Sequence, residues 1–144
     1  MNAGRLCTRV VATAAPTETV RAAATRMSEN DVGTLVVLGG EHGVPIGLVT
    51  DRDLVVRCIA AGLNPDTTPV SKVSSAPLHV VDEQTPIEDA LSRIAQAGVR
   101  RLVVTGPDQS LVGVLSLDDV LDLLVEEVSA IGRLLQKQAP TIAV

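Results

Sequence analysis

The chain contains one supersecondary unit twice. Residues 32–37 (VGTLVV) and 47–54 (GLVTDRDL) recur as residues 99–104 (VRRLVV) and 113–120 (GVLSLDDV). The first block returns after 67 positions and the second after 66, so one loop residue was lost between the copies. A duplicated unit that cannot bury its apolar face alone packs against its copy. We therefore expect one two-lobed body with a pseudo-twofold axis and related clefts between the lobes.

Hydrophobic periodicity predicts the same order of elements in both copies: strand, helix, strand, strand, helix. The second copy's first helix carries a marked start, with Thr85 as N-cap, Pro86 as the first helical residue and Glu88 completing a capping box. The other expected elements are strands at 10–13, 34–38, 46–50, 101–105 and 111–116, and helices at 17–29, 51–61 and 117–137. The predicted fold class is α/β, built from duplicated β-α-β-β-α units with an extended C-terminal helix.

Turn-forming residues separate the two copies. Residues 62–69 (GLNPDTTP) read as a linker. The predicted organisation is a first domain at 1–65, a second domain with the extended helix at 66–137, and a tail at 138–144.

Composition excludes several classes of function. The chain has no Phe, Tyr or Trp, so it lacks the stacking platforms on which single-stranded nucleic acid binding depends. A net charge of −5 argues against a phosphate-backbone binder. No stretch approaches the ~20 apolar residues that a membrane span requires. We therefore expect no nucleic acid partner, no membrane association and a cytoplasmic location.

The potentially reactive side chains are isolated in the sequence. Cys7 and Cys58 stand far apart, and neither His42 nor His79 has a spaced metal partner or a nearby nucleophile. Two buried or half-buried thiols in a reducing cytosol are the plainer interpretation than a disulfide or a zinc site. We expect no metal, no catalytic residue and no enzymatic activity.

The duplicated blocks carry a recognisable motif. Gly-hydrophobic-x-[Ser/Thr]-x-x-Asp occurs at residues 47–53 and again at 113–119, each time at a strand-to-helix junction. With the preceding Val-x-x-Leu-Val-Val strands, the chain resembles a tandem pair of CBS domains, a Bateman module, of the small stand-alone bacterial kind. The resemblance implies a pseudo-twofold CBS pair that is regulatory rather than catalytic. It also implies clefts for AMP, ADP, ATP or a similar adenosine-containing ligand, and a homodimer.

Two interpretations of the motif hydroxyls and carboxylates are compatible. Thr50 with Asp53, and Ser116 with Asp119, each form a helix-capping box by spacing alone. A helix start that faces a cleft also offers unpaired amides to a phosphate. The hydroxyl then donates to a phosphate oxygen, and the carboxylate accepts from ribose hydroxyls.

Basic residues make the two predicted sites unequal. Arg52 lies inside the first junction, where the second copy has Asp118. Arg100 and Arg101 open the second copy's strand, and similar proteins use basic residues at this place to reach phosphate. The alternatives are a solvated side chain for Arg52 and an ordinary polar strand edge for the other two.

Adenine recognition falls to backbone and aliphatic walls, because no aromatic side chain exists. The family pattern points to residues that flank the first helix of each copy, most of which are also expected core residues. They are Thr13, Ala14, Val32, Gly33 and Thr34 in the first copy, and Val80, Val81 and Val99 in the second.

The C-terminal helix carries a separate signal. Leu121, Leu124, Val128, Ile131 and Leu135 follow spacings of 3, 4, 3 and 4, as in a coiled-coil seam. The stripe packs either against the chain's own sheet or first lobe, or against another subunit.

The sequence therefore predicts a non-enzymatic sensor, a homodimer, that needs no cofactor and binds an adenine nucleotide between its lobes. The alternative is a ligand-free protein-interaction or stress-associated scaffold.

Overall fold

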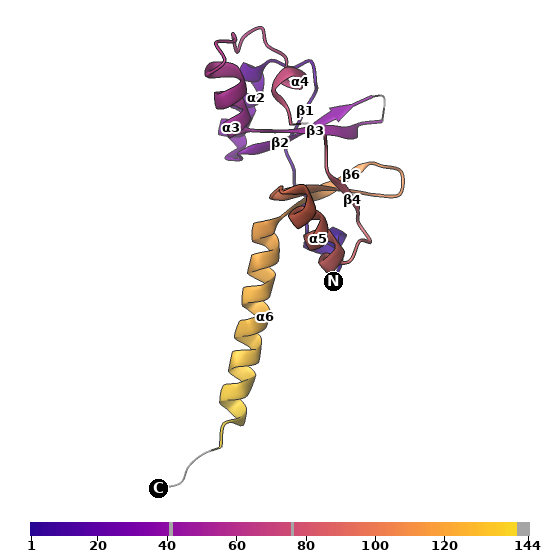
Figure 1. Cartoon of the computed structure of the whole chain (residues 1–144), viewed down its shortest axis with the longest axis vertical. Coiled ribbons are helices and arrows are strands. Elements are labelled where there is room, and N and C mark those ends of the chain that lie inside the picture. Colours follow the sequence, from indigo (N-terminus) through magenta and orange to yellow (C-terminus); the bar gives the residue numbers. More distant parts are fainter. Residues whose placement is uncertain (41, 76, 141–144) are drawn as a thin grey trace.

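The duplication is visible as two stacked lobes. The computed structural model describes residues 1–40, 42–75 and 77–140. It contains two three-stranded sheets, ordered β1-β2-β3 and β4-β5-β6. Figure 1 shows one lobe above the other, with a long C-terminal helix projecting away from both. Glu41, between the strands expected at 34–38 and 46–50, and residues 141–144 of the expected tail lie outside the described residues.

The first sheet combines one parallel and one antiparallel pairing, β1 with β2 and β2 with β3. A register shift interrupts the second pairing between Val37 and Leu38. The elements of this copy are β1 (Thr13–Ala14), α2 (Val20–Asn30), β2 (Thr34–Gly39), β3 (Val44–Thr50), α3 (Asp51–Asp53) and the π-helix η1 (Leu54–Ile59).

The second sheet repeats this pattern, including the register shift, which falls between Val104 and Thr105. Val104 lies 67 positions after Val37, so even the irregularity was duplicated. The elements of this copy are β4 (Val80–Asp82), α5 (Ile87–Ala97), β5 (Arg101–Thr105), β6 (Leu111–Ser116) and α6 (Leu117–Gln138). The predicted α/β class and the tandem organisation are confirmed.

Two short helices are exchanged between the lobes. α1 (Ala3–Leu6) packs on the second sheet, where the Ala3 amide donates to the Thr85 carbonyl at 2.8 Å. α4 (Val70–Val73) packs on the first sheet, where the Val70 amide donates to the Glu18 carbonyl at 2.7 Å. Each copy therefore completes the core of the other, and Figure 1 accordingly shows the N-terminus beside the lower lobe. The domain boundaries 1–65 and 66–137 remain a prediction that divides the chain by its repeats. The packed lobes do not follow that division, because each lobe contains a short helix from the other copy.

Two expected elements differ in detail. The strand predicted at 10–13 is β1 at Thr13–Ala14, because Val10 is 94% exposed and lies outside the sheet. The predicted helix at 51–61 contains a π-helical segment with a bond from the Ala60 amide to the Val55 carbonyl. Each difference concerns local geometry and leaves the order of elements intact.

The predicted capping box at Thr85 is wrong. Pro86 is the N-cap of α5 and supplies no side-chain bond, and the helix begins at Ile87. The equivalent of Pro86 in the first copy is Thr19, whose hydroxyl accepts from the Ala22 amide and caps α2. The carbonyl of Thr85 instead receives the Ala3 amide, so the exchanged segment occupies this helix start.

Each lobe has its own aliphatic core. Leu35, Val37 and Val49 lie in the first core, and Leu102, Val104 and Leu115 in the second. Cys58 belongs to the first core and Cys7 to the second; both are free and buried, as predicted. Burial raises the pKa of the Cys7 thiol. No helix within the described residues combines the length and apolarity needed to cross a bilayer.

Replacing Gly113 by Ala tests the exchange of segments. A Cβ at Gly113 would overlap the Thr8 carbonyl oxygen and lie 2.7 Å from Cys7 Sγ. We expect Gly113→Ala to lower the free energy of unfolding by about 1–3 kcal/mol, because the exchanged segment must move. Denaturant unfolding followed by far-UV circular dichroism measures the change.

The matched control is Gly47→Ala at the equivalent position of the first copy. A Cβ there meets Ser74 Oγ at an ordinary 3.4 Å. The free energy of unfolding should stay unchanged or rise by up to about 1 kcal/mol. Equal losses in the two variants would contradict the close packing of residues 7–8 on β6.

The buried thiols should be protected in the native protein. Cys7 is 8% exposed and Cys58 is fully buried, so both should react with a thiol reagent only upon unfolding. Titration with Ellman's reagent, with and without denaturant, measures this protection. Rapid reaction of either thiol in the native protein would contradict the placement of that cysteine in a core.

Candidate functional site

Each strand-to-helix junction is closed by a capping box. The Thr50 hydroxyl accepts from the Asp53 amide at 3.1 Å, and Asp53 Oδ2 accepts from the Thr50 amide at 2.9 Å. Ser116 and Asp119 repeat both bonds at 3.1 and 2.8 Å. The capping interpretation of the motif is therefore confirmed. Because each hydroxyl uses only its acceptor capacity in the box, its proton remains available for a ligand.

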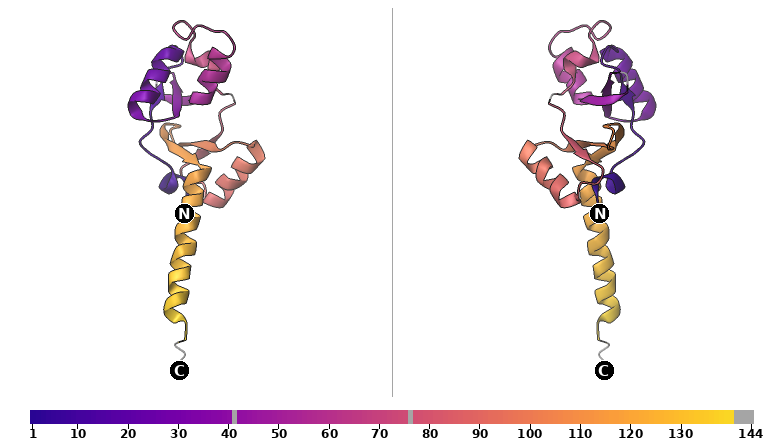
Figure 2. Two further views of the ribbon diagram at one scale, coloured as in Figure 1. Left: turned by 90° about the vertical axis from the view of Figure 1, so that its left-hand side faces the viewer. Right: turned by 90° about the vertical axis from the view of Figure 1, so that its right-hand side faces the viewer.

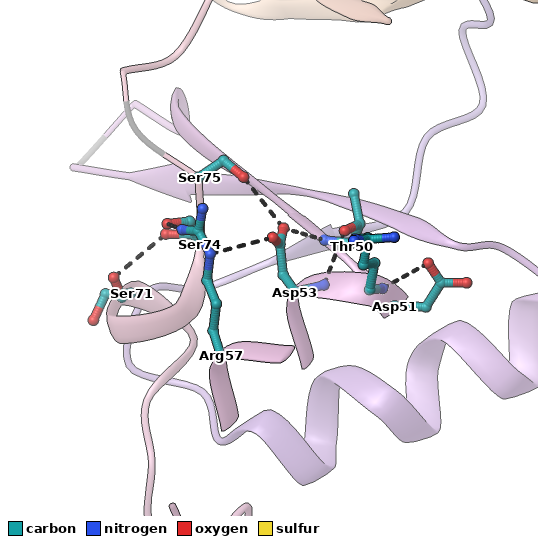
Figure 3. Close-up of polar contacts among 8 residues, drawn as sticks. Thr50, Asp51, Asp53, Arg57, Ser71, Ser74 and Ser75 are labelled. Carbon is teal, nitrogen blue, oxygen red and sulfur yellow. Dashed lines mark hydrogen bonds and ion pairs between the residues drawn. The ribbon is translucent and has the colours of Figure 1, made fainter. Parts of the chain in front are cut away.

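The two motif carboxylates differ in their remaining contacts. Asp53 Oδ2 also accepts from the Ser75 hydroxyl at 3.3 Å, and Asp53 Oδ1 lies 3.6 Å from Arg57 Nε (Figure 3). The Asp53 side chain is only 13% exposed. Within the described residues, Asp119 has no partner besides the Ser116 amide. A ligand therefore meets a freer carboxylate at Asp119 than at Asp53.

A cleft of about 570 Å³ opens beside the first junction, and we call it the arginine cleft. It joins the first copy's junction to the second copy's segment before β5. Arg52, Arg100 and Arg101 all line it, together with Asp51. The other lining residues are Leu48, Thr50, Ser75, Pro77, Leu78, His79, Gly98 and Val99.

A smaller cleft of about 260 Å³ lies beside the second junction, and we call it the acidic cleft. Its charged lining is Asp118, Asp119 and Arg101. The remaining lining residues are Thr8, Val10, Val11, Ala12, Val32, Gly33, Thr34, Val114 and Ser116. Most of these positions are the pseudo-symmetric equivalents of those in the arginine cleft, 66 or 67 residues apart.

Each cleft therefore combines the junction of one copy with the strand start of the other. The structure brings Thr50 and Arg52 together with Val99, Arg100 and Arg101, and it brings Ser116 and Asp119 together with Val32, Gly33 and Thr34. Volumes of about 300–1,000 Å³ are usual for small-molecule sites. The arginine cleft lies within this range and the acidic cleft just below it.

Some predicted site residues lie elsewhere. Thr13 and Ala14 line a separate surface pocket beside Arg26, and Val80 lines another beside Arg93. Val81 is buried in the second core. These four residues lie inside β1 and β4, whereas the extended segments before these two strands line the clefts. Asp53 is not in the cleft lining either, since Ser75 and Arg57 enclose it.

Sequence reasoning missed His79, which lines the arginine cleft and is half-buried. It lies just before β4 rather than inside a strand. Its equivalent in the first copy is Ala12, which lines the acidic cleft. The repeat offset of 67 residues, applied to this segment as well as to the motifs, would have indicated the pair.

The two clefts differ in the charge of their lining side chains. Three guanidinium groups and one carboxylate line the arginine cleft, whereas two carboxylates and one guanidinium line the acidic cleft. Arg100 lies 3.5 Å from Asp118, but both side chains are about 70% exposed, so the pair is weak. The arginine cleft is therefore the one suited to an anion.

No metal centre is evident in the described ranges, where no three His, Cys, Asp or Glu side chains are grouped to hold an ion. Two serine hydroxyls donate to carboxylates, Ser75 to Asp53 at 3.3 Å and Ser110 to Asp108 at 2.6 Å.

Comparison with known proteins places the chain in a family. The CBS domain model matches residues 3–59 and 70–126. The CBS domain-containing protein YhcV of Bacillus subtilis is 38% identical over 113 residues, which are 78% of each chain. An uncharacterized protein of Methanopyrus kandleri is 32% identical over 85% of this chain, and the match spans 62% of that protein's length.

Solved structures agree in fold. The CBS domain protein PAE2072 of Pyrobaculum aerophilum, complexed with AMP, is 27% identical with a TM-score of 0.76, over 90% of this chain and 99% of that one. Hypoxic Response Protein I, with two coordinated zinc ions, is 30% identical with a TM-score of 0.74, over 85% and 98%. With its two matched repeats and its crosswise clefts, this chain belongs to the CBS domain family as a tandem CBS pair.

Proposed function

We propose that this chain is a non-enzymatic regulatory module that binds an adenosine phosphate in the arginine cleft. The convergence of Arg52 from one copy with Arg100 and Arg101 from the other carries the proposal. Guanidinium groups bind phosphate oxygens through paired, charge-assisted hydrogen bonds. The similarity to an AMP-complexed CBS protein supports the adenosine part.

Each part of the ligand has a proposed partner. The free proton of the Thr50 hydroxyl donates to a phosphate oxygen beside the three arginines. Leu48, Leu78 and Val99 supply aliphatic walls for adenine. Because no aromatic ring stacks on the base, micromolar affinity is expected rather than nanomolar.

The ribose contact is the least preformed part of the site. Asp53, which is next to the arginine cleft but outside its lining, is the proposed acceptor, and a ribose hydroxyl would have to share it with Ser75 and Arg57. Its equivalent Asp119 is free for the same role in the acidic cleft. There, however, Asp118 and Asp119 repel a polyphosphate, so we propose that adenylates occupy the arginine cleft first.

Regulation would follow from the crosswise construction of the cleft. A ligand held by both copies stabilises the relative angle of the lobes that suits its contacts best. It shifts the equilibrium between lobe arrangements only by its differential affinity for them. We propose that a homodimer of this chain presents that change to a protein partner.

A scaffold with empty clefts is the second candidate. The small volume and the two carboxylates of the acidic cleft favour it for that side of the molecule. Ligand titration separates the two candidates, because a scaffold binds no adenylate.

The affinity of the protein for adenosine-containing ligands should increase when the ligand carries a phosphate. We expect AMP and ADP to bind at least about 10-fold more tightly than adenosine, since a charge-assisted hydrogen bond contributes about 1.5–3 kcal/mol. Isothermal titration calorimetry measures the order. The absence of Tyr and Trp makes the protein nearly dark at 280 nm, so a copurified nucleotide would also be visible at 260 nm. Equal affinity for adenosine and AMP would contradict a phosphate role for the arginines.

Arg100→Ala should weaken AMP binding by about 10- to 100-fold, because it removes one phosphate partner. The matched control is Arg133→Ala, which removes the same charge from an exposed position on α6. Asp119→Ala, on the acidic cleft, should leave this affinity within about 3-fold, since a carboxylate on the other cleft contributes mainly screened, long-range charge. Calorimetry on the three variants measures these effects. A loss of AMP affinity in Asp119→Ala, with no loss in Arg100→Ala, would place the ligand in the acidic cleft and contradict the proposal.

A further inference from the structure

The C-terminal helix α6 exposes a continuous apolar stripe. Its members recur at spacings of 3 and 4 residues, and each side chain is between 48% and 68% exposed. The stripe consists of Leu121, Leu124, Val128, Ile131 and Leu135, flanked by Val125 and Leu134. An apolar surface of this length is a marker of an interaction site.

The described part of the chain does not cover this stripe. Val120 is the buried residue of α6, and the helix leaves the lobes beyond it, as Figures 1 and 2 show from three directions. The equivalent helical segment of the first copy ends at Ile59, whose counterpart is Val125. Residues 126–138 therefore lengthen α6 beyond the corresponding helical segment of the first copy. The expected alternative of packing against the chain's own sheet is not what the structure shows.

We propose that α6 of one chain pairs in antiparallel orientation with α6 of a second copy. This deepens the homodimer included in the proposed function by naming its interface, and it is independent of the ligand. A seam of spacing 3, 4, 3 and 4 buries its residues against a partner helix of the same pattern.

Four of the five stripe residues meet apolar residues in this orientation, and Leu121 faces the partner's Gln138. When Val128 faces the partner's Ile131, Leu124 faces the partner's Leu135, and the same contacts repeat across the twofold axis. Apolar residues then meet apolar residues in the four central layers. Val125 and Leu134 lie on opposite flanks of the stripe, so each adds apolar area at one edge of the same interface.

Charge along α6 selects the direction. Asp118, Asp119, Asp122, Glu126 and Glu127 lie in the N-terminal part, and Arg133 and Lys137 lie in the C-terminal part. The antiparallel register sets the acidic half of one helix beside the basic half of the other, whereas a parallel pair sets acid beside acid. Antiparallel helices also oppose their dipoles favourably. Most of these charges lie on the helix face opposite the stripe, so they act through the net charge of each half of the helix and favour an orientation more than they add affinity.

The same charges argue against a lipid surface as the occupant. Amphipathic helices that lie on membranes carry Lys and Arg on the polar face. The polar face of α6 begins with five carboxylates, which an anionic bilayer repels. A second copy fits both the apolar stripe and the segregated charge.

The mass in solution tests the pairing. We expect the 15.0 kDa chain to assemble, and Val128→Glu with Ile131→Glu to halve the assembled mass in sedimentation velocity. Ser129→Glu with Gln136→Glu adds the same charge to the polar side of α6 and should leave the mass unchanged. Far-UV circular dichroism verifies that the variants fold. Calorimetry with AMP measures ligand binding separately, so that a failure of the pairing is distinguished from a failure of the proposed function. A monomeric wild type, or an unchanged mass in the stripe variant, would overturn the proposal.

Cysteine crosslinking tests the orientation. Mixed Leu124→Cys and Leu135→Cys proteins should form a disulfide-linked heterodimer, because the antiparallel register brings the two positions together. Leu135→Cys alone should not crosslink, since the two copies of residue 135 then lie about 16 Å apart along the axis. Efficient crosslinking of Leu135→Cys alone, without the heterodimer, would mean a parallel pair and would refute the antiparallel assignment.

Discussion

The exchange of two short segments between the lobes is the constraint on which the rest of the structure depends. Thr8 and Val114 bond to each other's backbones in both directions, at 2.9 and 3.0 Å, and the Ser75 amide donates to the Leu48 carbonyl at 2.8 Å. These bonds hold residues 8–12, and Ser75 with residues 77–79, across the boundary between the copies. Both segments line the clefts, so the contacts that join the lobes also build the binding sites.

Duplication made the two clefts alike in backbone, and later substitutions made them chemically different. Arg100 corresponds to Gly33, Arg52 to Asp118, and His79 to Ala12. The two arginines gather positive charge on one side, and Asp118 adds a carboxylate on the other. Because the capping boxes are conserved between the copies, both helix starts remain folded while the electrostatics diverge. The result is two clefts of different charge within one shared architecture.

Local pattern predicted most of the fold but not its long-range exchange. The strands at 101–105 and 111–116 and the long final helix follow from β-branched runs and apolar periodicity, which are local signals. The exchange of α1 and α4 rests on four-residue helices that carry no such signal. For the same reason, Thr50, Ser116 and the arginines could be nominated by motif, whereas the enclosure of Asp53 by Ser75 and Arg57 could not. The exposure of α6 could likewise not be predicted from the sequence. Its apolar stripe is compatible with packing on the chain's own lobes and with packing on a second subunit.

The most direct measurement of the central claim is a crystal structure of the chain grown with millimolar AMP. The account predicts one AMP per chain in the arginine cleft, with its phosphate between Arg100, Arg101 and the Thr50 hydroxyl. Solvent alone in that cleft, or AMP bound only beside Asp118 and Asp119, would contradict it.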